Sequence, residues 1–297
     1  MIKGYWPTAV VRVALGDLPD EREAVFERRG NSSPMPVPDV RRGVQVVGYE
    51  TAPGGDAEHA GLLLASDGAV TRESLEPGTE LGYRLERRHC AGDVTEGRHT
   101  PCDEEAAPYC DRHTGRWACA RCTGDCDLPL PSCREEHAVY LAAFAPATFK
   151  VGVTRSWRLD TRLREQGADR AAHLRTVADG RIARQIEAEI AADVGDRVRV
   201  PAKIRGLHRS VDDDAWAALL GEYEPLATFE FAYGLDLVER PMAETLAAGT
   251  VRGTTGRVLV LERTGSTYAV DLRDLVGYDL ADGGTDRALQ SSFAAFE

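Results

Sequence analysis

All seven cysteines of the chain lie between Cys90 and Cys133. Apolar periodicity nearly vanishes in this segment, so burial of side chains alone offers it little to fold around. Clustered thiolates are the ligands that structural Zn²⁺ prefers, and four of them close a tetrahedral site. The sequence therefore predicts a zinc-stabilised segment over residues 90–136, in which metal binding supplies folding free energy.

One histidine raises the number of soft ligands to eight, enough for two four-coordinate zinc ions. A compact grouping, Cys110-x2-His113-x5-Cys119-x2-Cys122, has a spacing that zinc tolerates, and the other cysteines would complete a second site. The predicted ligands are Cys90, Cys102, Cys110, His113, Cys119, Cys122, Cys126 and Cys133. His89, His99 and His137 lie close enough in sequence to replace one cysteine. Closed sites of this kind do no chemistry and would brace their neighbours.

Two other uses of the cysteines are less favoured. An extracellular disulfide scaffold usually has an even number of cysteines and a signal peptide, and we expect no secretory signal here because Arg12 interrupts the apolar start. A redox role for Cys119-x2-Cys122 would need a βαβ context, which the sequence does not suggest. The remaining alternative is that the cysteines bind no metal.

Basic residues gather in the segment that follows. The chain has a net charge of −12, yet 14 basic and 8 acidic residues lie between Lys150 and Arg209, a local charge of +6. Arg155, Arg158 and Arg162 would share one face if a helix starts early, and guanidinium groups hold phosphate with paired hydrogen bonds. We therefore predict an anion-binding surface, with Arg155 and Arg158 contacting nucleic acid; the alternative is a cluster of solvated charges.

Hydrophobic patterning indicates an α+β protein around these groups. Strands are expected at 44–49, 61–65 and 81–85, and a hairpin at 258–272. The expected units are a weakly structured leader (1–43), with at most one strand in 4–18, a small antiparallel sheet (44–89), the zinc segment (90–136), an α/β domain with a following helix (137–224) and a C-terminal small β-barrel or sheet (225–297).

The α/β domain carries the clearest pattern. Residues 137–144 and 149–154 predict a hairpin, followed by a helix, a strand at 173–177 and a helix with apolar residues every four positions from Ile182 to Val194. The expected order is thus β-β-α-β-α. Ser210 to Asp213 predicts the capping box of a further helix.

This segment resembles the GIY-YIG nuclease superfamily. Tyr140 stands where that family has the tyrosine of its first motif, and Lys150-Val151-Gly152 stands at its Tyr-Ile-Gly. Arg162 and Glu187 stand on the helices that carry the family's catalytic arginine and metal-binding glutamate. The resemblance implies catalytic roles for Tyr140, Lys150, Arg162 and Glu187, with Mg²⁺ or Mn²⁺ at Glu187.

Lys150 departs from the family pattern because it replaces the second tyrosine and its hydroxyl. Tyr140 can also be read as a core aromatic, and Glu187 as the ion-pair partner of Arg184. The whole arrangement is also similar to the domain-of-unknown-function family 2797, from about Val44 to the C-terminus, through His137 to Ala142, Lys150 to Arg155 and Arg164 to Ala168. That resemblance implies an architecture and no activity.

These observations favour a zinc-stabilised protein that binds or processes DNA or RNA, and they leave open a metal-dependent endonuclease. The rival hypotheses are a binding module with a degenerate nuclease fold and a zinc-scaffold adaptor for an unknown protein partner. No apolar stretch reaches the about 18 residues of a membrane span. The acidic, lysine-poor composition fits a salt-loving cytoplasm, although a GC-rich genome would explain it equally.

Overall fold

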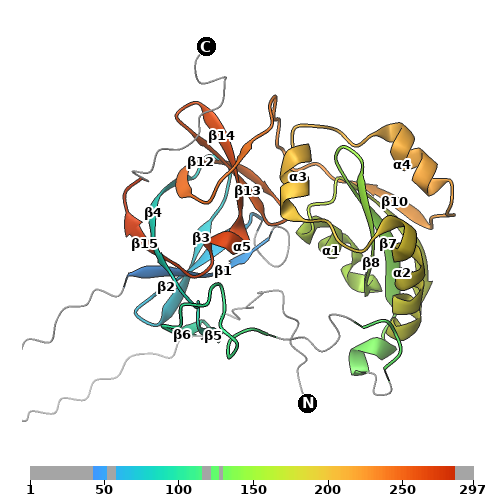
Figure 1. The fold of residues 1–297 in the computed structure, drawn as a ribbon, viewed down its shortest axis with the longest axis horizontal. Helices are drawn as coiled ribbons and strands as arrows, with labels where there is room; N and C mark the ends of the chain where they lie inside the picture. The colour runs from blue at the N-terminus through green and yellow to red at the C-terminus, as the bar shows by residue number, and fades with distance from the viewer. Residues whose placement is uncertain (1–42, 52–57, 116–121, 127–129, 285–297) are drawn as a thin grey trace, which may run out of the picture.

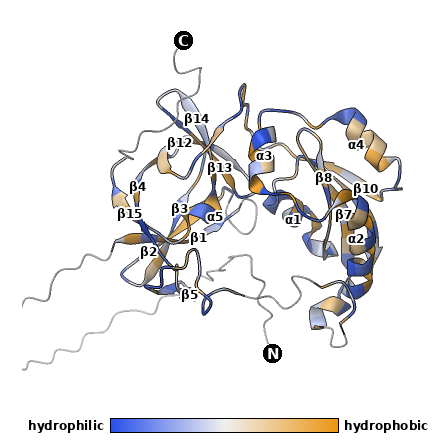
Figure 2. Cartoon of the chain, viewed as in Figure 1, coloured by the Kyte–Doolittle hydropathy of each residue, from blue (hydrophilic) through white to orange (hydrophobic). Residues whose placement is uncertain are grey.

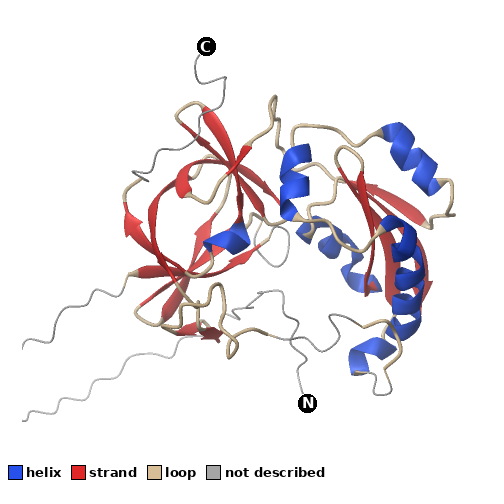
Figure 3. Cartoon of the chain, in the orientation of Figure 1, coloured by secondary structure: helices blue, strands red, loops and turns tan. Residues whose placement is uncertain are grey.

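The computed structural model describes residues 43–51, 58–115, 122–126 and 130–284. Cys119, the predicted strand within 4–18 and the predicted leader, apart from Gly43, lie outside the described residues. Two β-sheets stand side by side, and Figure 3 shows that most helices gather around the smaller one. The molecule is therefore mixed α+β and consists mostly of sheet.

Eleven strands form the larger sheet, in the order β11-β14-β13-β12-β4-β15-β1-β2-β3-β6-β5 (Figure 1). Its end strands do not pair with each other, so the described part of the chain contains no closed barrel. The strands and the one helix on this sheet are β1 (Val44–Glu50), β2 (Gly61–Ser66), β3 (Ala69–Ser74), β4 (Glu80–Arg88), β5 (Asp93–Thr95), β6 (Arg98–Thr100), β11 (Met242–Ala243), β12 (Ala247–Thr255), β13 (Val258–Arg263), β14 (Ser266–Asp271), α5 (Leu272–Leu275) and β15 (Tyr278–Asp282).

The N-terminal and C-terminal strands, expected as separate units, belong to this one sheet. β4 pairs with β12 on one edge and with β15 on the other, and β15 pairs with β1. Hairpins are visible in sequence because a short turn joins their strands. A pairing across more than 150 residues has no such local signal, so the two halves look independent until the fold joins them.

Local turn chemistry explains the hairpins within this sheet. Asp67 and Gly68 join β2 to β3, and Thr264 and Gly265 join β13 to β14; all four have positive φ. Such turns match the right-handed twist of paired strands. The inward residues of the strands, among them Leu62, form one apolar core with α5.

The smaller sheet has the strand order β10-β9-β7-β8 and is antiparallel throughout. The expected β-β-α-β-α order is present. The elements of this part are a 3₁₀ turn η2 (Pro131–Arg134), β7 (His137–Phe144), β8 (Thr148–Arg155), a 3₁₀ turn η3 (Ser156–Arg158), α1 (Leu159–Glu165), β9 (Arg170–Val177), α2 (Gly180–Val194), α3 (Val200–Gly206), α4 (Asp213–Leu220) and β10 (Ala227–Glu230).

The central strand β7 is buried along its whole length and divides two apolar clusters. Val139 and Leu141 face the cluster that includes Ile186 and Ile190 of α2; we call this the α2 face. Tyr140 points the other way, toward Leu163 of α1; we call this the α1 face. Because successive residues of a strand point to opposite sides, the two faces follow directly from the sequence of β7.

Two helix starts differ from the sequence expectation. α1 begins at Leu159, so Arg155 ends β8 and does not share a helix face with Arg162. The cap of α4 is Asp212, whose carboxylate accepts from the N–H of Ala215 at 3.0 Å, and not Ser210. Figure 2 shows hydrophilic and hydrophobic residues alternating along α2, as expected for a helix with one side on a sheet. None of the described helices is both long and apolar enough to span a membrane.

The two sheets touch where a turn of the larger one meets the end of α1. A Cβ at Gly256, between β12 and β13, would lie 2.7 Å from the backbone nitrogen of Gly167. A Cβ at Gly167 would in turn lie 2.7 Å from Oγ1 of Thr255. Both glycines also have positive φ, so this close backbone approach leaves no room for a side chain.

Candidate metal centre and basic cluster

Four side chains from the predicted zinc segment meet at the end of β4. The Sγ atoms of Cys90, Cys102 and Cys110 and a ring nitrogen of His113 all lie within 4.8 Å of one another. The Nδ1 atom of His113 is 3.3 Å from the Sγ of Cys90 and 3.2 Å from that of Cys110. Tetrahedral zinc places thiolate sulfurs about 3.8 Å apart, so this Cys3His cluster has ligands of the right kind, number and spacing.

The surroundings of the cluster act differently on two of its thiols. Cys90, Cys102 and Cys110 are buried, and the N–H groups of Gly92 and Cys110 donate to the Sγ of Cys90. Burial opposes ionisation of the Cys110 thiol, but hydrogen bonds from the backbone of His113 and Arg112 outweigh it and lower its pKa to about 6. Burial raises the pKa of the Cys90 thiol. A bound zinc would deprotonate both thiols.

The cluster differs from the compact grouping suggested by spacing. Among the described residues, Cys110 and His113 join Cys90 and Cys102 and not Cys122, while Cys119 lies outside the described residues. The reason is that the strands β5 and β6 pair, which turns the chain back and brings Cys102 next to Cys90. The spacing of residues in sequence gives only their separation along the chain, so it does not show that β5 and β6 fold back on each other.

Two of the alternative histidines contribute differently. His89 is buried and lies outside the cluster: its Nδ1 is 2.8 Å from the carbonyl oxygen of Cys102, and its Nε2 is 3.2 Å from Asp279 of β15. His89 thus ties the Cys102 loop to the larger sheet. The Nε2 of His99 lies 2.9 Å from the carbonyl oxygen of Ala91.

Three further cysteines lie beside the smaller sheet. Burial raises the pKa of the Cys126 thiol, and the nearby thiols of Cys122 and Cys133 raise it further. The loop that contains Cys122 and Cys126 packs closely on the first turn of α2. A Cβ at Gly124 in this loop would lie only 2.5 Å from the carbonyl oxygen of Arg181. His137, the third alternative histidine, is buried, and its Nδ1 lies 2.7 Å from the carbonyl oxygen of Glu135.

The four residues expected to be catalytic do not meet. Tyr140 lies on the α1 face, whereas Glu187 belongs to α2, which covers the opposite face. Glu187 accepts a hydrogen bond from Arg184, one turn earlier, and the two form an ion pair. Only 13% of the Glu187 side chain is exposed. The expected convergence of Tyr140, Arg162 and Glu187 around one metal is therefore wrong, because the strand that carries Tyr140 separates it from α2.

The other expected residues come together on the α1 face. Lys150 stands opposite Ala142 in the β7–β8 ladder, so it shares the face of Tyr140. The side chain of Gln166 donates to Oη of Tyr140 at 2.6 Å. Arg162, one turn before Gln166, donates to Glu165 at 3.1 Å. Strand β8 and helix α1 thus place Lys150 and Arg162 near the Tyr140 hydroxyl.

Lys203 of α3 completes this group, and sequence reasoning missed it. Its Nζ donates to the backbone carbonyl of Gln166 and lies 4.4 Å from the centre of the Phe144 ring. Burial, together with the nearby charges of Lys150, Arg257 and Arg162, lowers the pKa of Lys203 to about 7. That Lys203 is one of only three lysines in the chain was the available signal. We call Lys150, Arg162 and Lys203 the basic cluster.

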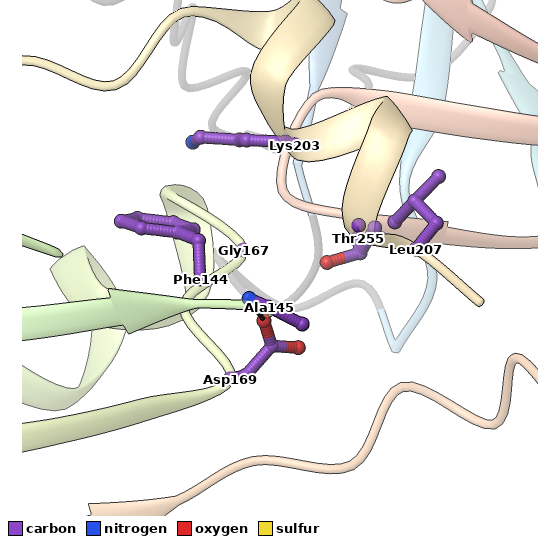
Figure 4. A pocket seen from close by; sticks show the side chains of 8 residues that line it. Phe144, Ala145, Gly167, Asp169, Lys203, Leu207 and Thr255 are labelled. Carbon is purple, nitrogen blue, oxygen red and sulfur yellow. Dashed lines mark hydrogen bonds between the residues drawn. The ribbon is translucent and has the colours of Figure 1, made fainter. Parts of the chain in front are cut away.

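A small pocket opens between the two sheets next to Lys203 (Figure 4). Phe144 and Asp169 line it from the smaller sheet, and Thr255 lines it from the larger one. The Oδ2 atom of Asp169 accepts from the N–H of Ala145 at 2.8 Å, and burial raises the pKa of this carboxyl group. The larger sheet therefore forms one wall of the space beside the basic cluster.

Arg155 and Arg158, the expected nucleic-acid contacts, are held in ion pairs. Arg155 donates to both carboxylate oxygens of Glu135 at 3.2 Å, and Arg158 donates to Glu165 at 2.7 Å. Their side chains are only 14% and 17% exposed. Each guanidinium group thus already has a carboxylate partner, and Arg158 shares Glu165 with Arg162.

Comparison with known proteins gives one family. The family model described as "Protein of unknown function (DUF2797)" matches residues 94–280, a shorter stretch than the resemblance from about Val44 and one that begins after Cys90. Searches of curated proteins and of solved structures gave no match. The matched residues span both sheets and more than half of the chain, and the chain therefore belongs to the DUF2797 family.

Proposed function

We propose that this protein binds nucleic acid through the basic cluster and that its smaller sheet is a zinc-braced, GIY-YIG-like unit that grips phosphate without cutting it. The observation that carries the proposal is the convergence of Lys150, Arg162 and Lys203 on one face. Three cations from a strand and two helices, beside the hydroxyl of Tyr140, offer a phosphate group both charge and hydrogen bonds.

The electrostatics of Lys203 support an anionic ligand. Crowding of like charges costs free energy when the site is empty, because burial and neighbouring cations disfavour the charged amine. A bound phosphate offsets both effects, because it places an opposite charge beside the amine. Asp169 lies close enough to raise the pKa of Lys203, but burial and the surrounding cations outweigh it.

The carboxylates of the α1 face argue for binding over cleavage. A metal-dependent nuclease holds its cation with carboxylate oxygens beside the reacting phosphate. Glu165 is engaged by both Arg158 and Arg162, and Asp169 accepts from a backbone N–H. Glu187, the residue expected to hold Mg²⁺ or Mn²⁺, is on the opposite face.

Zinc has a structural role in this proposal. The Cys3His cluster binds one ion and holds the ends of β4 and β6 together. A second ion is proposed beside α2 at Cys122, Cys126 and Cys133, whose loop packs on that helix, although these three sulfurs are not gathered in the way that the Cys3His ligands are. The two ions would then brace the larger and the smaller sheet respectively.

Equilibrium binding tests the function directly. Fluorescence anisotropy with labelled DNA and RNA, starting at low salt, should show binding by the parent protein. Lys150→Glu should weaken it at least tenfold, and Arg162→Ala should reduce the slope of log affinity against log salt by roughly one. Arg252→Ala is the matched control, because Arg252 is an exposed arginine on β12 paired with Glu262.

Two outcomes would contradict the proposal. If the parent binds no nucleic acid at low salt, the zinc-scaffold adaptor becomes the better hypothesis. If added Mg²⁺ or Mn²⁺ produces cleavage that Lys150→Glu abolishes, the protein is a nuclease that uses another arrangement of ligands.

A further inference from the structure

The most exposed aromatic side chain of the described residues is Trp157. Among the exposed large hydrophobic residues described, it is the only aromatic one, with 68% of its surface accessible. It lies in the 3₁₀ turn η3, between β8 and α1. An aromatic ring that stays in water does not gain the free energy of burying its apolar surface. An exposed tryptophan therefore stabilises the fold less than a buried one would.

The ring of Trp157 is held in place by its neighbours. Its indole N–H donates to a carboxylate oxygen of Glu135 at 3.3 Å. The guanidinium carbons of Arg155 and Arg158 lie 5.4 and 6.0 Å from the ring centre. These contacts restrict the side chain before any ligand arrives, so less conformational entropy is lost when a flat group stacks on it.

Trp157 is connected to the basic cluster through one carboxylate. Glu165, of which 7% of the side chain is exposed, accepts from Arg158 at 2.7 Å and from Arg162 at 3.1 Å. Arg158 is the next residue after Trp157, and Arg162 belongs to the basic cluster. The ring is thus linked through Arg158 and Glu165 to Arg162, the member of the basic cluster on α1.

We propose that Trp157 is a base-stacking platform and that the preferred ligand of this protein is single-stranded nucleic acid. This inference rests on the proposed function. Phosphates would lie at the basic cluster and one base would stack on the indole ring. Single strands present unstacked bases to such a ring, whereas the bases of a duplex are already stacked on one another.

The charge around Trp157 is the reason to choose nucleic acid over an apolar protein partner. Arg155 and Arg158 flank the ring, and together with Arg162 these three guanidinium groups outnumber the two carboxylates that they pair with, Glu135 and Glu165, so the network keeps a net positive charge. A hydrophobic protein contact would have to desolvate these charges. A nucleotide matches them, because it combines an aromatic face with a negative phosphate.

The test compares one substitution on matched ligands. Anisotropy at low salt measures Trp157→Ala, Trp157→Phe and the parent on a single strand, a hairpin duplex of equal length and an abasic strand that keeps the phosphates. Leu226→Ala is the control, because Leu226 is similarly exposed, at 64%, and directly precedes β10. Circular dichroism confirms that each variant is folded.

We expect Trp157→Ala to lose about 5- to 150-fold in affinity for the single strand, which is the range of one base–aromatic stack. Trp157→Phe should recover most of it, and neither variant should change binding of the abasic strand. If Trp157→Ala binds the single strand as the parent does, or weakens single strand and duplex equally, the stacking inference is wrong while the proposed function stands. If the parent binds none of the three ligands, both are wrong.

Discussion

The ring of Tyr140 lies directly over Gly152, its partner across the β7–β8 hairpin. A Cβ built on Gly152 would be 2.5 Å from Oη of Tyr140 and 2.6 Å from Cζ, closer than real atoms pack. The glycine is therefore required by the tyrosine and not by the backbone. The same contact leaves the hydroxyl free to accept from Gln166, which positions it beside the basic cluster.

Gly152→Ala should therefore destabilise the protein by about 1–3 kcal/mol, the usual cost of overpacking a core. Chemical denaturation of the variant and of the parent measures this difference in the free energy of unfolding. Tyr140→Ala in the same chain should remove most of the added cost, because the clashing atoms are gone. Equal and additive losses in the double variant would show that the two residues do not interact.

Removal of zinc should loosen the larger sheet. Cys102→Ser should lower zinc content by about one ion per chain in elemental analysis, and chelation should lower the midpoint of thermal unfolding, because metal binding contributes to folding free energy. His99→Gln is the control: its ring contacts the carbonyl of Ala91 and is not part of the cluster. Full zinc content in Cys102→Ser would remove Cys102 from the ligand set.

Glu187→Gln should have little effect on binding. Glu187 pairs with Arg184 on the α2 face, away from Tyr140, so we expect unchanged affinity and a stability loss of at most about 1 kcal/mol. The comparison is Arg162→Ala, which should weaken binding. A Glu187→Gln variant that loses a divalent-metal-dependent activity would restore the catalytic hypothesis.

Affinity for nucleic acid should fall as the pH rises above about 7. The pKa of Lys203 is about 7 in the free protein, and a bound phosphate favours its charged form and raises that pKa. The favourable contribution is therefore complete below pH 7 and is lost as the pH rises through the pKa of the complex.

Binding measured from pH 6 to 9 with the parent and with Lys203→Met checks this expectation. The variant cannot titrate at this position, so its affinity should match that of the parent only at high pH. The charges that face Lys203 are those of Lys150, Arg162, Arg257 and Asp169; only Asp169 is acidic. A parent profile that runs parallel to that of Lys203→Met would mean that Lys203 does not contact the ligand.

The sequence was sufficient for the local structure. Alternating residues in β7, turn residues such as Thr264-Gly265 and the four-residue apolar spacing of α2 act over a few positions, so their outcome is readable along the chain. The clustering of cysteines was readable along the chain in the same way, and three of them meet with His113 in a Cys3His cluster compatible with a zinc site.

Only the tertiary structure could settle which of these parts meet. Cys90 and Cys102 become neighbours because β5 and β6 return the chain, and β4 gains partners from the C-terminal strands. Lys203 joins Lys150 because α3 packs on the larger sheet and brings Lys203 over Phe144 of β7, while Glu187 is excluded from this face by the smaller sheet itself. The physical reason is that backbone turns and periodicity act between neighbours in sequence, whereas a site depends on contacts between distant segments, which the burial of the whole core selects.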